Sequence, residues 1–131
     1  MKKRTIWVID DDLIYKTIMK KIISKSNIFS HVSTFSNGKE AIDAIKENLT
    51  NNGILPDIIL LDIEMPTLDG WGFMDEFTIL KPQFKSTINI YISSSSIANE
   101  DKLKAKNNPD ILGYMSKPIS LNDLILISSF D

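Results

Sequence analysis

The chain has 131 residues, of which 43% are hydrophobic and 24% charged, and this composition fits one ordinary globular domain. We expect residues 1–131 to form a single domain, with no output domain. The lack of cysteine excludes disulfides and thiolate metal sites, and no apolar run is long enough to span a bilayer or act as a signal peptide. A net charge of −2 gives no general attraction to nucleic acid, and we expect a cytoplasmic protein.

The N-terminal segment predicts a strand followed by a helix. Residues 5–10 form a short apolar run that ends on three consecutive aspartates, Asp10, Asp11 and Asp12. Residues 13–26 predict a helix in which isoleucines recur every four residues and lysines occupy the other faces; the two sets include Ile14, Ile18 and Ile22, and Lys16 and Lys20. We interpret Asp12 as the N-cap of this helix, because short acidic side chains accept backbone hydrogen bonds at that position.

The second unit repeats this alternation. Residues 31–35 are β-branched and aromatic, which predicts a strand. Asn37 and Gly38 then open a helix, which ends at the Asn-Asn-Gly sequence over residues 51–53. The apolar positions of this helix are spaced to form one buried stripe, which consists of Ala41, Ile42, Ile45 and Leu49.

The third unit contains the most apolar strand. Residues 57–62 form a near-continuous apolar run that ends on Asp62, as expected for a strand that is covered on both faces. A loop with the sequences Met-Pro and Asp-Gly follows over residues 65–70. Residues 71–80 predict a helix, and Pro82 terminates it because proline lacks the backbone donor that a helix needs.

The last two units are shorter. Residues 88–93 predict a strand, and a run of four serines follows at its end, Ser93 to Ser96. Residues 99–107 predict a helix with a solvated lysine face. Residues 111–116 predict the fifth strand, and a capping-box sequence that begins at Ser120 starts a final helix.

Five strand–helix units with short connections predict a parallel sheet with helices on both faces. Because the carboxyl ends of parallel strands meet at one edge of such a sheet, we expect Asp10, Asp11 and Asp62 to lie close together. Several carboxylates at one place repel each other unless they share a proton or bind a cation. A hard divalent cation with oxygen ligands, above all Mg²⁺, is the expected solution.

These residues, in this order, carry a family resemblance. An acidic pair after the first strand, an aspartate after the third, hydroxyl residues after the fourth and Lys117-Pro118 after the fifth resemble the receiver domain of bacterial two-component response regulators. The resemblance covers essentially the whole chain and points to a stand-alone, chemotaxis-type receiver. It implies an α/β fold: a flavodoxin-like, doubly wound five-stranded parallel sheet with strand order 2-1-3-4-5.

The resemblance also implies roles for individual residues. Asp62 matches the phosphoacceptor. Asp10 and Asp11 match the acidic pair that, with Asp62 and the backbone carbonyl of Glu64, holds Mg²⁺. Lys117 matches the lysine that pairs with a phosphoryl oxygen, for which a flexible ammonium group is well suited. The peptide bond between Lys117 and Pro118 matches one that is usually cis.

Two further assignments follow from the resemblance. One hydroxyl residue after the fourth strand bonds the phosphoryl group in relatives. Counting back from Ile97 selects Ser94, whereas counting forward along the strand selects Ser93; we favour Ser94. Glu64 and, if Ser94 is that residue, Ser96 occupy positions that influence the lifetime of the phosphoryl group in relatives. Tyr114 matches the aromatic switch residue, and its alternative interpretation is an exposed strand tyrosine.

We therefore expect a Mg²⁺-dependent phosphoacceptor that is phosphorylated on Asp62 by a sensor histidine kinase or a histidine phosphotransfer protein. It catalyses at most its own phosphotransfer and autodephosphorylation. Signalling would pass by protein contact, without nucleic acid or membrane, through the face formed by the fourth helix, last strand and last helix, where relatives also dimerise. The alternative is a receiver-like interaction module that works without phosphorylation. A flavodoxin fits less well, because three aspartates after the first strand would repel a phosphate.

Overall fold

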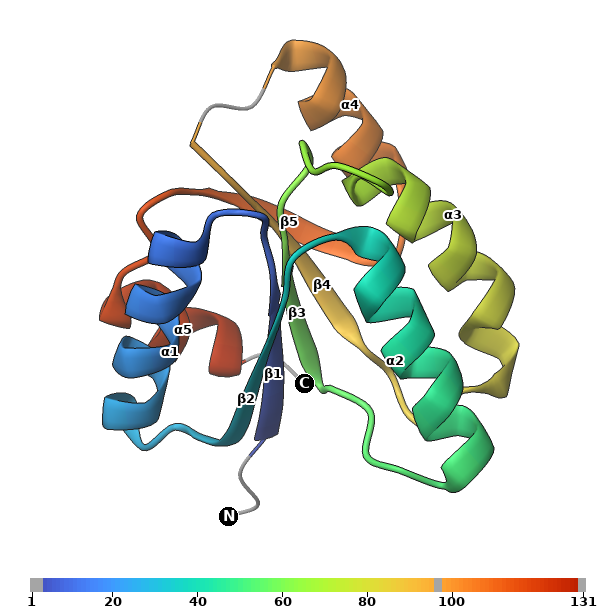
Figure 1. Ribbon diagram of the computed structural model, residues 1–131. Helices are drawn as coiled ribbons and strands as arrows, with labels where there is room; N and C mark the ends of the chain where they lie inside the picture. Colours follow the sequence, from blue (N-terminus) through green and yellow to red (C-terminus); the bar gives the residue numbers. More distant parts are fainter. Residues whose placement is uncertain (1–3, 96–97, 130–131) are drawn as a thin grey trace.

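The computed structural model describes residues 4–95 and 98–129, and in this part of the chain five strands alternate with five helices (Figure 1). The strands are β1 (Arg4–Ile9), β2 (Phe29–Phe35), β3 (Ile58–Leu61), β4 (Asn89–Ser94) and β5 (Ile111–Ser116). The helices are α1 (Leu13–Ser26), α2 (Gly38–Asn51), α3 (Gly70–Leu80), α4 (Asn99–Asn107) and α5 (Leu121–Ser128), with a 3-10 turn, η1 (Lys81–Gln83), after α3. Ser96 lies outside the described residues.

The strands form one parallel sheet in the order β2-β1-β3-β4-β5, which confirms the fold expected from the sequence. The register determines which residues lie together at the carboxyl edge of the sheet. Leu61 pairs with Ile9 on one side and with Ile92 on the other. The residues that follow these three therefore lie at the same level: Asp62 and Asp10, which come directly after their strands, and Ser93, which is still part of β4.

Helices cover both faces of the sheet, and each face has its own core. Helices α1 and α5 lie on one face, and α2 and α3 on the other (Figure 1). The core under α2 and α3 includes Ile59, Phe73 and Phe77, and the core under α1 and α5 includes Leu60, Met19 and Leu124. Alternate residues of β3 point into different cores, which explains why this strand is apolar at every position.

The helix starts follow the capping chemistry of the sequence. Asp12 caps α1 by accepting a hydrogen bond from the backbone N–H of Tyr15, and Asn37 caps α2 in the same way through Glu40. Ser120 forms the expected capping box with Asp123 at the start of α5. Helix α3 begins one residue earlier than expected, at Gly70, because Asp69 acts as its N-cap.

The buried face of α1 differs from the one expected. The isoleucines that recur every four residues do not form the core stripe: Ile14 and Ile18 are 74% and 50% exposed. The helix instead buries Met19, Ile23 and Lys16. A lysine can occupy this position because its long apolar stem packs inside while its ammonium group reaches a polar partner, here Ser36 Oγ at 2.6 Å.

Four strands have boundaries that differ from the sequence prediction. Strand β1 is displaced by one residue toward the N-terminus and ends at Ile9, directly before the three aspartates. Strand β2 begins two residues earlier, at Phe29, which is buried in the core under α1 and α5. Strand β3 is one residue shorter at each end, although the flanking residues Asp57 and Asp62 still donate backbone hydrogen bonds to the neighbouring segment, at Thr5 O and Ile9 O. Strand β4 is displaced by one residue and ends at Ser94. Among the described residues, no helix combines the length and apolar character that crossing a bilayer requires.

Candidate functional site

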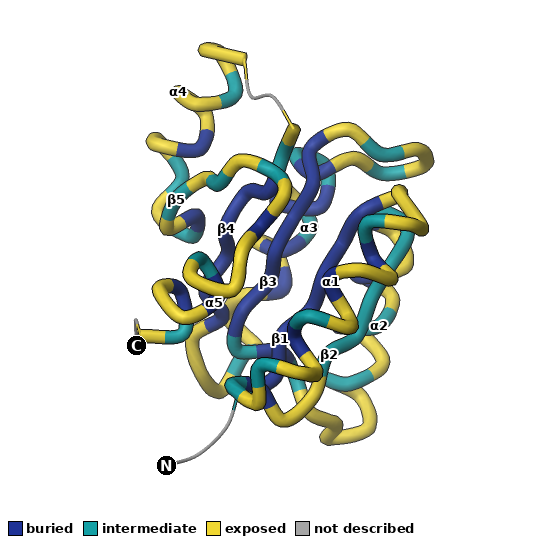
Figure 2. Tube along the Cα trace, turned by 90° about the vertical axis from the view of Figure 1, so that its left-hand side faces the viewer, coloured by how far each residue is buried: buried dark blue, intermediate teal, exposed yellow. Residues whose placement is uncertain are grey.

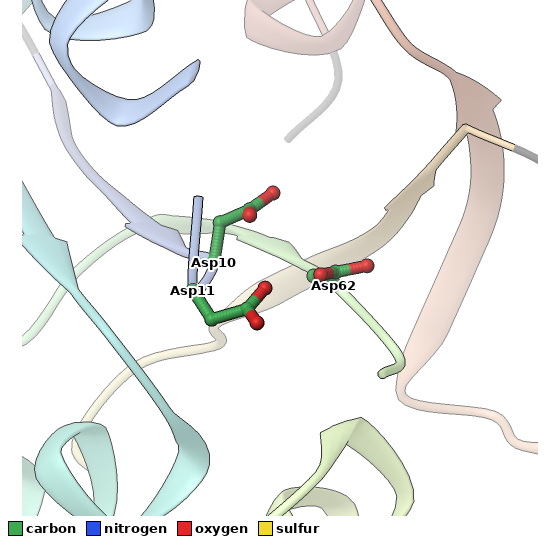
Figure 3. A group of neighbouring side chains, drawn as sticks. All are labelled: Asp10, Asp11 and Asp62. Carbon is green, nitrogen blue, oxygen red and sulfur yellow. The ribbon is translucent and has the colours of Figure 1, made fainter. Parts of the chain in front are cut away.

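Three aspartates meet at the carboxyl edge of the sheet, as the sequence predicted. Asp10 and Asp11 follow β1, Asp62 follows β3, and their carboxyl groups gather at the same edge (Figure 3). Each offers a carboxylate oxygen within 4.8 Å of those of the other two. Asp10 and Asp62 are 1% and 8% exposed, whereas Asp11 is exposed. Two of the three negative charges therefore lie where water screens them poorly.

Backbone hydrogen bonds fix the two buried aspartates. The N–H of Asp62 donates to Ile9 O at 2.9 Å, which ties the end of β3 to the end of β1. One oxygen of each carboxylate is also occupied: Asp10 Oδ1 accepts from Asp12 N, and Asp62 Oδ1 accepts from Ile63 N, both at 2.9 Å. In each residue this leaves Oδ2 for other partners.

Lys117 supplies the positive charge of the site. It follows β5, its backbone N–H donates to Ser94 O at 2.9 Å, and its peptide bond to Pro118 is cis. Its ammonium group contacts Asp10 Oδ2 directly and lies 3.7 Å from Asp62 Oδ2. Burial alone would lower the pKa of Lys117, but the hydrogen bond and charge of Asp10, together with the charge of Asp62, outweigh it and raise the pKa.

The pKa of Asp62 is raised from 3.8 to about 6 in the metal-free site. Burial is the largest cause, and the negative charge of Asp10 adds to it. Lys117 and the hydrogen bond from Ile63 act in the opposite direction but do not cancel the effect. Asp62 is therefore a carboxylate that an added positive charge would stabilise.

The residues present fit a hard divalent cation. All three side chains offer carboxylate oxygens, the donor type that Mg²⁺ prefers. Asp10 Oδ2 is buried. Among the described residues, its polar contact is the ion pair with the Lys117 ammonium group. A buried oxygen with spare acceptor capacity, next to a carboxylate with a raised pKa, is a place where a cation would bind favourably.

The loop between β3 and α3 closes one side of the site. Gly70 brings this loop back against the strand end, where its N–H donates to Ile63 O at 2.8 Å. A Cβ atom at Gly70 would lie 2.5 Å from Asp62 O, so only glycine allows this approach. Thr67, in the same loop, has a φ of 69°, which is unusual for a β-branched residue. Glu64 is exposed.

The two candidate hydroxyl residues differ in their surroundings. Ser93 is 2% exposed, and its Oγ lies 3.2 Å from the hydroxyl of Tyr15. Ser94 is half-buried and lies one residue farther along β4 than the level of Asp62. Tyr114 is 47% exposed on β5, and its ring centroid is 5.7 Å from the Lys102 ammonium group of α4.

Sequence reasoning missed Tyr15. Its ring centroid lies 4.6 Å from Lys117 Nζ, so it borders the site although it lies outside all the expected motifs. One signal was available, because Tyr15 is three residues after the N-cap Asp12 and therefore in the helical turn nearest the strand ends. The lysines of α4 were interpreted as a solvated face, yet Lys104 lies 5.4 Å from the ring centroid of Trp71 on α3.

Comparison with known proteins places this geometry in a family. The response regulator receiver domain family matches residues 6–128. A two component response regulator from Cytophaga hutchinsonii is 30% identical, with a TM-score of 0.86, and the match covers 96% of this chain and 95% of that one. A receiver domain of a sensor histidine kinase from Pseudomonas aeruginosa, solved with a magnesium ion coordinated in the active site cleft, is 18% identical, with a TM-score of 0.74 and coverage of 97% and 95%. The latter likeness concerns the fold alone.

Curated relatives include longer proteins. A protein-glutamate methylesterase/protein-glutamine glutaminase 1 from Syntrophomonas wolfei is 30% identical over 126 residues, which are 95% of this chain and 33% of that protein. A second protein of that name, from Methanospirillum hungatei, is matched over only 19% of its length. This chain therefore spans a third or less of these two relatives. Receiver domains interact with histidine kinases and act as phosphoacceptors. The match over residues 6–128 shows that this chain belongs to the response regulator receiver domain family.

Proposed function

We propose that the chain is a Mg²⁺-dependent phosphoacceptor of two-component signalling, and that Asp62 receives the phosphoryl group. The donor would be a phosphohistidine on a sensor histidine kinase or on a histidine phosphotransfer protein. The observation that carries this proposal is the cluster itself: three carboxylates within 4.8 Å of one another, with the Lys117 ammonium group against Asp10 and 3.7 Å from Asp62. The carboxylates alone would repel a phosphoryl group, but a divalent cation held by them, together with Lys117, would present positive charge to its oxygens.

Asp62 has the properties of the attacking group. Its Oδ1 is held by the backbone N–H of Ile63, whereas Oδ2 faces Lys117. A pKa of about 6 leaves the carboxylate mostly ionised at neutral pH. In the transfer, an Asp62 oxygen forms a bond to phosphorus as the nitrogen–phosphorus bond of the phosphohistidine breaks, and the imidazole leaves with the electron pair.

Cations would stabilise the transferred group. Asp10, Asp11 and Asp62, with the backbone carbonyl of Glu64, would hold Mg²⁺, which supplies positive charge opposite the phosphoryl oxygens. The Pseudomonas aeruginosa receiver domain holds magnesium in its active site cleft, which makes this ion the first to test. Lys117 would move from Asp10 Oδ2 toward a phosphoryl oxygen, because the phosphoryl group adds up to about two negative charges beside it.

We assign the phosphate-binding hydroxyl to Ser94 rather than to Ser93. Ser93 lies level with Asp62, is buried, and bonds Tyr15. A phosphoryl group on Asp62 extends beyond the end of the strand, which is the direction in which Ser94 lies. The carbonyl of Ser94 also accepts the backbone N–H of Lys117, so movement of Ser94 would reach β5 directly.

The signal would leave through α4, β5 and α5. Tyr114 and Leu103 border a cavity of about 500 Å³ between α4 and β5, which gives room for a change in this region. These three elements also carry exposed apolar side chains suited to a protein partner or a second copy of the chain, namely Leu103, Leu112, Tyr114, Leu121, Ile125 and Leu126. Tyr114 would be the residue that couples Ser94 to this surface.

The test is a titration with beryllofluoride, which mimics an acyl phosphate on aspartate, followed by amide NMR with and without Mg²⁺. We expect Mg²⁺-dependent shifts around Asp62, Ser94 and Tyr114, and none in Asp62→Asn. Asp75→Asn, which removes an exposed carboxylate on α3, is the matched control and should respond like wild type. A folded wild type that gives no response would overturn the proposal and favour an interaction module that needs no phosphorylation.

A further inference from the structure

Tyr15 is built into the wall of the acidic site from both its backbone and its side chain. Its N–H donates to the N-cap Asp12 at 3.1 Å, and Asp12 directly follows Asp10 and Asp11. Its half-buried side chain packs against the core under α1 and α5. The position of the ring is therefore tied to the same chain segment that carries the acidic pair.

The side chain of Tyr15 joins three elements of the fold. It extends from α1, its hydroxyl lies 3.2 Å from Ser93 Oγ on β4, and its ring lies against the ammonium group of Lys117 after β5. The distance from Lys117 Nζ to the ring centroid is 4.6 Å, well inside the range of a cation–π contact. The Lys117 ammonium group thus has two carboxylates near it and an aromatic ring as a further contact.

An aromatic ring suits this position for an electrostatic reason. The face of the ring attracts a cation without adding a formal negative charge to a site that already has three carboxylates. Burial raises the pKa of Tyr15, so its hydroxyl stays neutral at physiological pH. The attraction extends over the face of the ring to about 6 Å from its centroid, so the ammonium group, now at 4.6 Å, can shift across the face and keep this contact.

We infer that Tyr15 is a positioning residue for phosphoryl transfer: its ring holds the Lys117 ammonium group beside Asp62 while that group moves from Asp10 to the phosphoryl oxygen, and its bond to Ser93 fixes the ring. The inference rests on the proposed function. It assigns two separable parts to one side chain, since the ring contacts Lys117 and the hydroxyl contacts Ser93. The ring should matter more for the reaction than the hydroxyl does.

The test compares Tyr15→Phe, which keeps the ring, with Tyr15→Leu, which keeps an apolar contact with the core but removes the ring. With acetyl phosphate and Mg²⁺, we expect Tyr15→Leu to be phosphorylated about three- to tenfold more slowly than wild type, the size of one partly buried cation–π contact. Tyr15→Phe should remain within about twofold, since it retains that contact. Thr17→Ala, on the exposed side of the same helix, is the control and should match wild type.

A second measurement reads the contact without any phosphodonor or metal. In wild type and Tyr15→Phe, the ring current should displace the NMR signals of the Lys117 methylene next to the ammonium group, and Tyr15→Leu should abolish that displacement. Equal phosphorylation rates for Tyr15→Leu and wild type would overturn the inference, as would Tyr15→Phe being as slow as Tyr15→Leu. A wild type that takes no phosphoryl group overturns the proposed function, whereas a wild type without the ring-current displacement overturns this inference alone.

Discussion

The end of β3 and the helix α4 both border the functional region, but they are held in place by different forces. Every residue of β3 is buried, and each is at most 1% exposed. Of the residues of α4, which are all described, Ala105 is the one that is buried (Figure 2). The strand that carries Asp62 is thus anchored by apolar burial on two faces, whereas α4 lies on the surface of the molecule.

Helix α4 is held mainly by polar contacts with α3 and β5. Its Asp101 accepts a hydrogen bond from Trp71 Nε1 at 2.9 Å, and the ammonium groups of Lys104 and Lys102 lie over the rings of Trp71 and Tyr114. Each such contact contributes about 0.5–1.5 kcal/mol, whereas one buried aliphatic side chain contributes several. The difference implies that the strand carrying Asp62 is held rigidly, whereas α4 can shift at a small cost in free energy. This combination suits the proposed function, in which a fixed phosphorylation site acts on a surface that can change.

The largest effect is expected where the apolar anchor is removed. Ile59→Ala truncates a fully buried side chain in the centre of β3, and the cavity it leaves should lower the free energy of unfolding by about 2–5 kcal/mol. Chemical denaturation measures this value. Ile79→Ala is the matched control, because Ile79 is 70% exposed on α3 and its truncation should change stability by less than about 0.5 kcal/mol. Equal effects of the two truncations would refute the anchoring role of β3.

A glycine pair tests how closely the loop must approach the site. Gly70→Ala places a Cβ atom 2.5 Å from the carbonyl oxygen of Asp62, so the backbone must move, at a cost of about 1–3 kcal/mol in unfolding free energy. At Gly113, on β5, the nearest atom to a new Cβ lies 3.8 Å away, which is ordinary contact. Gly113→Ala should therefore be nearly neutral in the same denaturation experiment. A Gly70→Ala protein as stable as Gly113→Ala would show that the loop can relax without strain.

The pH dependence of stability tests the electrostatics of the cluster. The pKa of Asp62 is raised in the folded state, so protonated Asp62 favours folding and ionised Asp62 opposes it. The destabilisation is absent below about pH 4, grows as the pH rises through 6, and is complete above that. Asp62→Asn should thus stabilise the metal-free protein by about 1–2 kcal/mol at pH 7.5, a value reduced for access of water, and have no such effect at pH 4.

Denaturation in the presence of a chelator measures that gain across the pH range. Asp75→Asn, which removes an exposed carboxylate, should show no comparable pH dependence. Addition of Mg²⁺ should stabilise wild type more than Asp62→Asn, because the variant lacks one of the three carboxylates. A gain from Asp62→Asn that is the same at both pH values would exclude ionisation of the buried Asp62 carboxylate as its cause.

The sequence predicted the strand-end residues better than it predicted the helix faces. Asp10 and Asp62 could be placed together because the alternation of strands and helices fixes which ends of the strands meet. The buried face of α1 could not be found from periodicity, because Ile14, Ile18 and Lys16 reverse the usual order of exposed and buried residues. Whether a lysine is buried depends on a partner distant in the sequence, here Ser36, which no local pattern reveals.

Side-chain contacts between elements were likewise beyond local patterns. The Tyr15 contact with Lys117 joins residues about 100 positions apart, and the Trp71 contact with Asp101 joins α3 to α4. Both depend on how the helices pack on the sheet, which motif spacing does not determine. The resemblance to a family located Asp62 and Lys117, but a residue such as Tyr15 that belongs to no motif became visible only with the packed structure.

The smallest expected effect concerns α4 and bears most directly on the comparison. Amide hydrogen exchange should show far lower protection for α4 than for β3, because polar contacts rather than apolar burial hold the helix. Asp101→Ala removes the acceptor for Trp71 Nε1, and we expect α4 amides to exchange about two- to fivefold faster, the equivalent of about 0.5–1 kcal/mol. Asp101→Asn keeps an oxygen acceptor for Trp71 but removes the negative charge, which is favourable in the first turn of α4. It therefore separates the effect of the hydrogen bond from the effect of the charge. If the α4 amides of Asp101→Asn exchange as fast as those of Asp101→Ala, the charge of Asp101 and not its bond to Trp71 holds the helix. If α4 and β3 are equally protected in wild type, α4 opens only when the whole molecule unfolds. The contrast between a rigid site and a helix that can shift would then be wrong.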